Sequence, residues 1–246
     1  MPNLSWARLA GWKYTPRGFD WALIAILLAG VFFRVAALGS MEGMLTFDEA
    51  YNGVDCLSLL QAPRLTPFFP ANHGREAAWM YVLTPFVAVF GARPLALRLA
   101  AAMTGILTLA AISALGYEVL GRRGATWATG ALAVRYWHVH LSHLALRANL
   151  FLLVGTLAAA ALLRAQRTHA LRWWIAGGLA SGFLVYTYFS AYLWLAYALA
   201  LLVIWLVVDR TRRRGAALAL AAVAAVSLPM ALYALTHRQE VLGRPT

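Results

Sequence analysis

Long apolar runs separated by short arginine clusters recur along almost the whole chain, and they constrain the fold more than any other feature. Hydrophobic residues make up 62% of the sequence and charged residues 12%. A water-soluble domain usually carries roughly a quarter of charged residues. Crossing a bilayer takes about 20 apolar residues in a helix. The sequence therefore predicts an all-α polytopic membrane protein with about seven transmembrane helices.

The basic residues are distributed as in cytoplasmic loops, although a formal net charge of +12 could also suggest a nucleic-acid partner. We place the spans near 20–39, 95–120, 124–142, 148–165, 173–190, 191–208 and 216–235. The basic clusters at 8–17, 122–123, 164–172 and 210–214 then all fall on one side, which the positive-inside rule assigns to the cytoplasm. This pattern predicts a cytoplasmic N-terminus, membrane lipid as the surrounding partner and no nucleic acid.

The first extracytoplasmic loop, residues 40–94, is chemically unusual because it holds most of the acidic residues: Glu42, Asp48, Glu49, Asp55 and Glu76. Within it, residues 77–91 are apolar but only about 15 residues long, which is below the usual spanning length. Counting them as a span would also move Arg122 and Arg123 outside. We therefore predict an interfacial helix there.

The stretch TFDEAYNGVDCLSLLQAP predicts a second short helix in the same loop, which Pro63 ends. At helical spacing, one face is apolar (Ala50, Val54, Leu57, Leu60) and the other carries Asp48, Asn52 and Asp55. Thr46 and Glu49 fit a capping box, a structural alternative to a catalytic role for Glu49. For Asp48 we favour general-base chemistry, since a carboxylate at a membrane surface beside Phe47 can keep the necessary basicity.

These motifs together resemble the GT-C glycosyltransferases. The segments FDEAYNG, FFPANHGRE and PLALRLAAAMTGILT, in this order and topology, are most similar to the protein O-mannosyltransferases, the aminoarabinose transferase and the bacterial dolichyl-phosphate-mannose-protein mannosyltransferase-like proteins. The resemblance covers residues 1–246 as one GT-C transmembrane module. It implies two juxtamembrane helices in the first outer loop and a bacterial inner-membrane location. It also implies inverting transfer of a monosaccharide from a polyprenyl-phosphate-linked sugar to an extracytoplasmic protein, lipid or glycan acceptor.

The resemblance also assigns site residues. Asp48 corresponds to the base that deprotonates the acceptor, and Glu49 would support it. Arg98 opens the next span, where a guanidinium suits a lipid phosphate. The family usually has an acid before its fourth span, where this chain offers Arg147 and Asn149 instead. The expected substrate-binding residues are Tyr51, Asn52, His73, Arg75, Glu76, Arg98, Arg147 and Asn149.

Two other functions remain open at this point. A transporter or lipid flippase would need an acid within a span, but Glu118 and Asp209 fall at cytoplasmic span ends beside arginines. A catalytically incomplete fragment is the other alternative, since relatives continue beyond a seventh span, whereas this sequence stops at THRQEVLGRPT.

Several residues inside or near the spans also call for an interpretation. No metal ligand is assigned and no cofactor is required, although His138, His140 and His143 leave a divalent metal open. Tyr186 and Tyr188 fit an aromatic belt better than a sugar platform. Arg135 lies within the third predicted span, so we expect it to face a wet cavity, to pair with Glu49 or to reach the outer interface.

Overall fold

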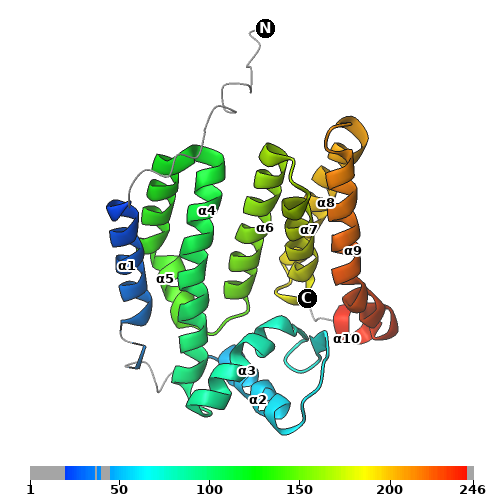
Figure 1. Ribbon diagram of the computed structural model, residues 1–246. Helices are drawn as coiled ribbons and strands as arrows, with labels where there is room; N and C mark the ends of the chain where they lie inside the picture. Colours follow the sequence, from blue (N-terminus) through cyan, green and yellow to red (C-terminus); the bar gives the residue numbers. More distant parts are fainter. Residues whose placement is uncertain (1–19, 37, 40–44, 243–246) are drawn as a thin grey trace.

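The computed structural model describes residues 20–36, 38–39 and 45–242, which are almost entirely helical (Figure 1). The helices are α1 (Trp21–Val35), α2 (Phe47–Gln61), α3 (Ala78–Phe90), α4 (Pro94–Val134), α5 (Tyr136–His143), α6 (Ala148–Thr168), α7 (Leu171–Phe183), α8 (Ala191–Val208), α9 (Arg213–Thr236) and α10 (Arg238–Leu242). A 3-10 turn, η3 (Leu184–Tyr186), follows α7. A short two-stranded sheet pairs β1 (Phe68–Phe69) antiparallel with β2 (Arg75–Glu76), a feature that the sequence did not predict.

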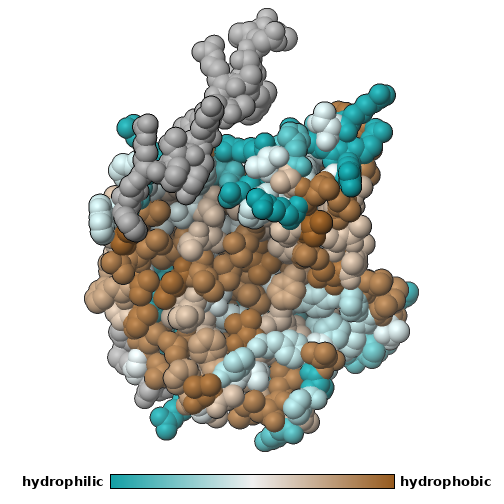
Figure 2. Space-filling view, viewed as in Figure 1, coloured by the Kyte–Doolittle hydropathy of each residue, from teal (hydrophilic) through white to brown (hydrophobic). Residues whose placement is uncertain are grey.

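The long helices form a bundle with an apolar surface, as expected for an all-α polytopic membrane protein. Within the described chain, α4, α6, α8 and α9 are the 4 helices long and apolar enough to cross a membrane. Helices α1 and α7 are shorter, with 15 and 13 residues, so the predicted count of about seven crossings stays a prediction. Apolar residues cover the middle of the visible face, and hydrophilic residues gather at its upper end (Figure 2).

Helix α4 contains two of the predicted spans because the chain folds back at Gly121. This residue has φ 74 and ψ −169, a conformation that only glycine adopts readily. The two arms then pack closely: a Cβ on Gly116 would lie 2.9 Å from the Cα of Ala125. Helix α1 packs along both arms, since Gly30 approaches Leu109 of the first arm and Ala133 of the second. The second predicted span ends at residue 120 and the third begins at residue 124, so these two boundaries lie on either side of the turn at Gly121.

The prediction of one continuous span over 124–142 was wrong. The second arm of α4 ends at Val134, and α5 is a separate helix that begins at Tyr136. Arg34 of α1 donates from Nη2 to the carbonyl oxygen of Leu132 (3.0 Å) and from Nη1 to that of Ala133 (3.1 Å). In a continuous helix these carbonyls would accept from the backbone N–H groups four residues later. The buried guanidinium thus caps the end of α4 where the sequence has neither glycine nor proline.

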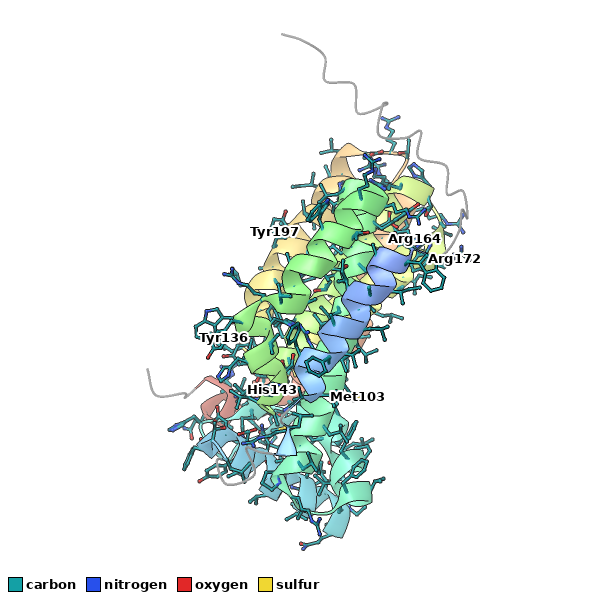
Figure 3. All side chains as sticks on the ribbon, turned by 90° about the vertical axis from the view of Figure 1, so that its left-hand side faces the viewer. Met103, Tyr136, His143, Arg164, Arg172 and Tyr197 are labelled. Atoms are coloured by element: carbon teal, nitrogen blue, oxygen red, sulfur yellow. The ribbon has the colours of Figure 1, made fainter. Side chains whose placement is uncertain are left out.

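Helices α2 and α3 pack together at one end of the bundle (Figure 1). Arg164 and Arg172 lie at the opposite end (Figure 3). The two predicted juxtamembrane helices are thus present, with α2 spanning Phe47–Gln61 and α3 spanning Ala78–Phe90. Helix α2 buries its polar face, including Asn52 and Asp55, and exposes apolar residues such as Phe47 and Val54. An exposed apolar face fits a helix that lies in the membrane interface.

Cysteine labelling tests the predicted topology. We expect a cysteine at Gln61 to react with an impermeant thiol reagent in intact cells, and a cysteine at Arg123 to react only after lysis, since these exposed positions lie at opposite ends of the bundle. The native Cys56 should contribute little background, because it is fully buried and burial raises the pKa of its thiol to about 11. Labelling of both new cysteines from the same side would mean that α3 crosses the membrane.

Candidate active site

The carboxylate of Asp48 is exposed in the first turn of α2. It accepts a hydrogen bond from Nδ2 of Asn72 (2.8 Å), which lies in the turn between β1 and β2. The turn places a residue 24 positions away in the sequence against the predicted base. Asp48 is therefore available to an incoming molecule and is held by a neutral donor. Asn72 was absent from the predicted site, because only the tertiary fold brings it to Asp48.

Glu49, in contrast, is fully buried and both of its carboxylate oxygens are used. The predicted capping box is present: Oε2 accepts from the backbone N–H of Thr46 (2.9 Å), and the N–H of Glu49 donates to Oγ1 of Thr46 (3.3 Å). Oε1 accepts from Nε of Arg98 (3.4 Å) and from the N–H of Ala145 (3.0 Å). This arrangement makes Glu49 a structural junction between α2, α4 and the α5–α6 loop.

Arg75 fills the interior beside the polar face of α2. Its side chain is fully buried, forms an ion pair with Asp55, and donates to Oδ1 of Asn52 (2.9 Å). The guanidinium carbon also lies 5.5 Å from the centroid of the Tyr51 ring. Burial raises the pKa of the Asp55 carboxyl even though Arg75 favours its charged form. Tyr51, Asn52 and Arg75, all predicted site residues, thus meet in the structure, and Asp55 joins them.

Glu76 and Arg147 form a third ion pair in this region, after Glu49–Arg98 and Asp55–Arg75. Nη1 of Arg147 donates to Oε2 of Glu76 (2.5 Å), whose side chain is fully buried. Arg147 lies just before α6, and its guanidinium carbon is 5.8 Å from the centroid of the Tyr188 ring. The loop before α6 has no carboxylate beside Arg147 in the sequence, and the first outer loop brings the carboxylate of Glu76 to it. The Arg147 side chain is 16% exposed, whereas that of Glu76 is fully buried.

The backbone of a single residue, Ala145, connects these elements. The carbonyl oxygen of Ala145 accepts from Nδ2 of Asn52 (2.9 Å) and from Nε1 of Trp79 (2.8 Å), while its N–H donates to Glu49. Side chains from α2 and α3 therefore bind the backbone of the loop that carries Arg147. We call the buried set Glu49, Asn52, Asp55, Arg75, Glu76 and Arg98, together with Arg147, the polar cluster.

The remaining predicted residues have other surroundings. His73 is exposed in the β1–β2 turn. Asn149 is buried and donates from Nδ2 to the carbonyl oxygens of Leu141 and Leu144, both at 2.8 Å, so it closes the end of α5. Of the three surroundings expected for Arg135, pairing with Glu49 is wrong: Arg135 is exposed, and Glu49 binds Arg98 and Ala145.

The three histidines of the α5 region make different contacts. Nδ1 of His138 lies 2.7 Å from Nη2 of Arg34, and the His140 ring stacks on Tyr136 at a centroid distance of 5.6 Å. His143 lies at the bundle flank near α1 (Figure 3). Over the described ranges, no group of three or more His, Cys, Asp or Glu side chains is placed to hold a metal ion.

An apolar cavity of about 470 Å³ lies between α3, residues 65–67, η3 and α9. Its wall includes Ala77 and Ala78, which directly follow Glu76 of the polar cluster. The hydroxyl of Tyr186 donates to the carbonyl oxygen of Val226 (2.7 Å) and accepts from the N–H of Met230 (3.3 Å), so it inserts into the α9 ladder beside Pro229.

The second tyrosine of the wall, Tyr81, also uses its hydroxyl on the backbone: it accepts from the N–H of Thr66 (2.8 Å). Because backbone groups take up both hydroxyls, the lining that faces the cavity stays apolar.

A family profile described as dolichyl-phosphate-mannose-protein mannosyltransferase matches residues 77–233, which is more than half of the chain. The match begins at α3, so the polar cluster lies partly inside it (Arg98, Arg147) and partly before it (Glu49, Arg75). No curated protein and no solved structure matches the chain. The profile match and the all-α membrane architecture agree with the resemblance seen in the sequence. The chain therefore belongs to the dolichyl-phosphate-mannose-protein mannosyltransferase family, whose members are membrane glycosyltransferases of the GT-C type.

Proposed function

We propose that this protein is an inverting glycosyltransferase that moves a monosaccharide from a polyprenyl-phosphate donor to an acceptor outside the cytoplasm. The observation that carries the proposal is the exposed carboxylate of Asp48, which lies beside a buried cluster of arginines and carboxylates in a member of a mannosyltransferase family. The acceptor is a hydroxyl of a protein, lipid or glycan. The predicted location is a bacterial inner membrane.

In the proposed reaction, Asp48 removes the proton of the acceptor hydroxyl as its oxygen attacks the anomeric carbon. The bond between that carbon and the phosphate oxygen breaks, and the polyprenyl phosphate leaves with the electron pair. Attack from the face opposite the phosphate inverts the anomeric centre. Glu49 holds the first turn of α2, and therefore Asp48, against the α5–α6 loop.

Arg147 is the group that we propose for the leaving phosphate. Its guanidinium is partly exposed, and a guanidinium can stabilise charge that grows on a phosphate oxygen. Arg98, which the sequence favoured for this role, is fully buried against Glu49. We therefore propose that Arg98 acts indirectly, by fixing Glu49 and the loop that presents Arg147.

The apolar cavity supports a lipid-linked donor. A ligand with a phosphate at Arg147 could place hydrocarbon in the cavity, since Glu76, the partner of Arg147, directly precedes the wall residues Ala77 and Ala78. Apolar pockets with a few polar groups at one edge are typical of small-molecule sites.

The direct test is release of polyprenyl phosphate. Purified protein in liposomes would be given labelled polyprenyl-phosphate-linked sugars with candidate acceptors, and we expect both free polyprenyl phosphate and glycosylated acceptor. Movement of the intact labelled donor across the bilayer without sugar transfer would instead identify a flippase. Neither release nor movement with any donor would favour a catalytically incomplete fragment.

Filling the cavity should weaken donor binding. Val82 lines the cavity from α3, so Val82→Trp is expected to raise the donor KM several-fold, with kcat little changed at saturating donor, because the added ring competes for the space of the hydrocarbon chain. Val89→Trp is the matched control, since Val89 lies on the same helix and is 74% exposed. An unchanged donor KM in Val82→Trp would remove the cavity from the donor site.

A further inference from the structure

The turn between β1 and β2 has an unusual backbone. Asn72, His73 and Gly74 have φ values of 51, 60 and 78 in succession. Left-handed conformations are unfavourable for residues with a side chain, and asparagine is among the residues that tolerate them best. Non-glycine residues keep such conformations only where the surrounding structure enforces them, often at functional sites.

Packing on the β1 side enforces this turn. A Cβ on Gly74 would lie 2.5 Å from Cζ of Phe68, so only glycine fits against that ring. Phe68 is itself buried, and its ring lies 6.0 Å from the ring of Tyr233 in α9. The first strand is thus anchored to the helix bundle.

The other side of the turn is anchored to α2. Arg75, the residue after Gly74, forms its ion pair with Asp55 and donates from Nε to the carbonyl oxygen of Ala71 (3.2 Å). The N–H of Gly74 donates to the same carbonyl oxygen (3.3 Å). The turn is therefore closed on itself and tied at both ends, which fixes the position of the residue at its tip.

The consequence of this rigidity falls on Asp48. Nδ2 of Asn72 lies 2.8 Å from Oδ1 of Asp48, and in the described parts of the chain it is the only hydrogen-bond donor to that carboxylate. An exposed aspartate in a first helical turn would otherwise sample several rotamers. The fixed amide selects one of them and occupies one oxygen, so that the second oxygen has a defined direction.

We propose that Asn72 is a positioning residue, which holds the carboxylate of Asp48 in the orientation that receives the acceptor proton. This inference rests on the proposed function of Asp48 as the base. The left-handed turn costs energy, but it places a neutral amide donor beside Asp48. An arginine at the same place would form an ion pair with the base and block it. Placement within a fraction of an ångström matters in catalysis, and a shift of about 1 Å can cost on the order of a hundredfold in rate.

Asn72→Gly is the sharpest variant, because glycine accepts the left-handed backbone and removes only the amide. We expect kcat to fall about tenfold to a hundredfold, while the donor KM and the thermal stability stay near those of the parent. Ala71→Gly is the matched control: it introduces a glycine into the same exposed turn, leaves the amide in place and should keep the parental rate.

The double variant Asp48→Asn/Asn72→Gly separates positioning from other roles. If Asn72 acts through Asp48, the double variant should be as slow as Asp48→Asn alone, so that the two effects are not additive. A parental kcat in Asn72→Gly would overturn the inference, and so would an equal loss in both backgrounds or a rate loss that follows a lowered Tm. A parental rate in Asp48→Asn would instead overturn the proposed base itself.

Discussion

Replacing Asp48 with Asn is expected to slow sugar transfer by on the order of a hundredfold to ten-thousandfold, which is the usual cost of losing a general base. The fold should hardly change. Asp48 is exposed, its Oδ1 would be replaced by an amide oxygen that can still accept from Asn72, and loss of a first-turn charge costs under about 1 kcal/mol. Turnover with a polyprenyl-phosphate-linked sugar, measured beside thermal unfolding in detergent, checks both expectations.

Glu49→Gln provides the contrast for this experiment. A glutamine still completes a capping box, but it removes the negative charge that faces the fully buried Arg98. We expect its turnover to fall in proportion to lost stability, whereas Asp48→Asn should separate the two quantities. An Asp48→Asn protein that transfers sugar at the parental rate would end the assignment of Asp48 as base.

The parts of the site that the sequence predicted correctly are those set by local rules. The capping box of Thr46 and Glu49 lies within one helical turn, so the T-x-x-E spacing is enough to find it. The separation of α2 into an apolar and a polar face also follows from helical periodicity. Likewise, the length of the run at 77–91 predicted a short helix outside the spans, and α3 occupies Ala78–Phe90.

The parts that the sequence missed depend on partners far away in the chain. The break between α4 and α5 is made by Arg34, whose guanidinium reaches carbonyl groups 98 and 99 positions later. No local signal at residues 134–136 marks it. Asn72 could have been suspected from the Asn-His-Gly sequence, which is typical of a left-handed turn, but its contact with Asp48 depends on the anchoring of Phe68 and Arg75.

Arg98 shows how a correct residue can be given an incomplete role. Its place at the start of a span, next to an outer loop, predicted an open cationic site for a lipid phosphate. In the structure, the ion pair with Glu49 buries both side chains completely. The sequence could not show this, because the capping box accounts for only one of the two oxygens of Glu49, and the other is used by Arg98 and Ala145.

Replacing Arg98 with Met should therefore act mainly on stability. Removing one partner of a buried ion pair leaves an uncompensated charge and typically costs about 3–5 kcal/mol. The Glu49 carboxylate would lose a cationic partner while it remained at the α2–α4 contact, and the loop that carries Arg147 would lose support. We expect a strongly lowered unfolding temperature in detergent and a poor yield of folded protein.

The double variant Glu49→Gln/Arg98→Met should recover part of the lost stability, because removing both charges of a buried pair is far less costly than removing one. A direct role in phosphate binding makes the opposite forecast: Arg98→Met would fold with near-parental stability, would lose donor affinity, and would not be improved by Glu49→Gln. Unfolding temperature and donor KM, measured on the two single variants and the double variant, therefore decide between an arginine that holds Glu49 in place and an arginine that binds the donor.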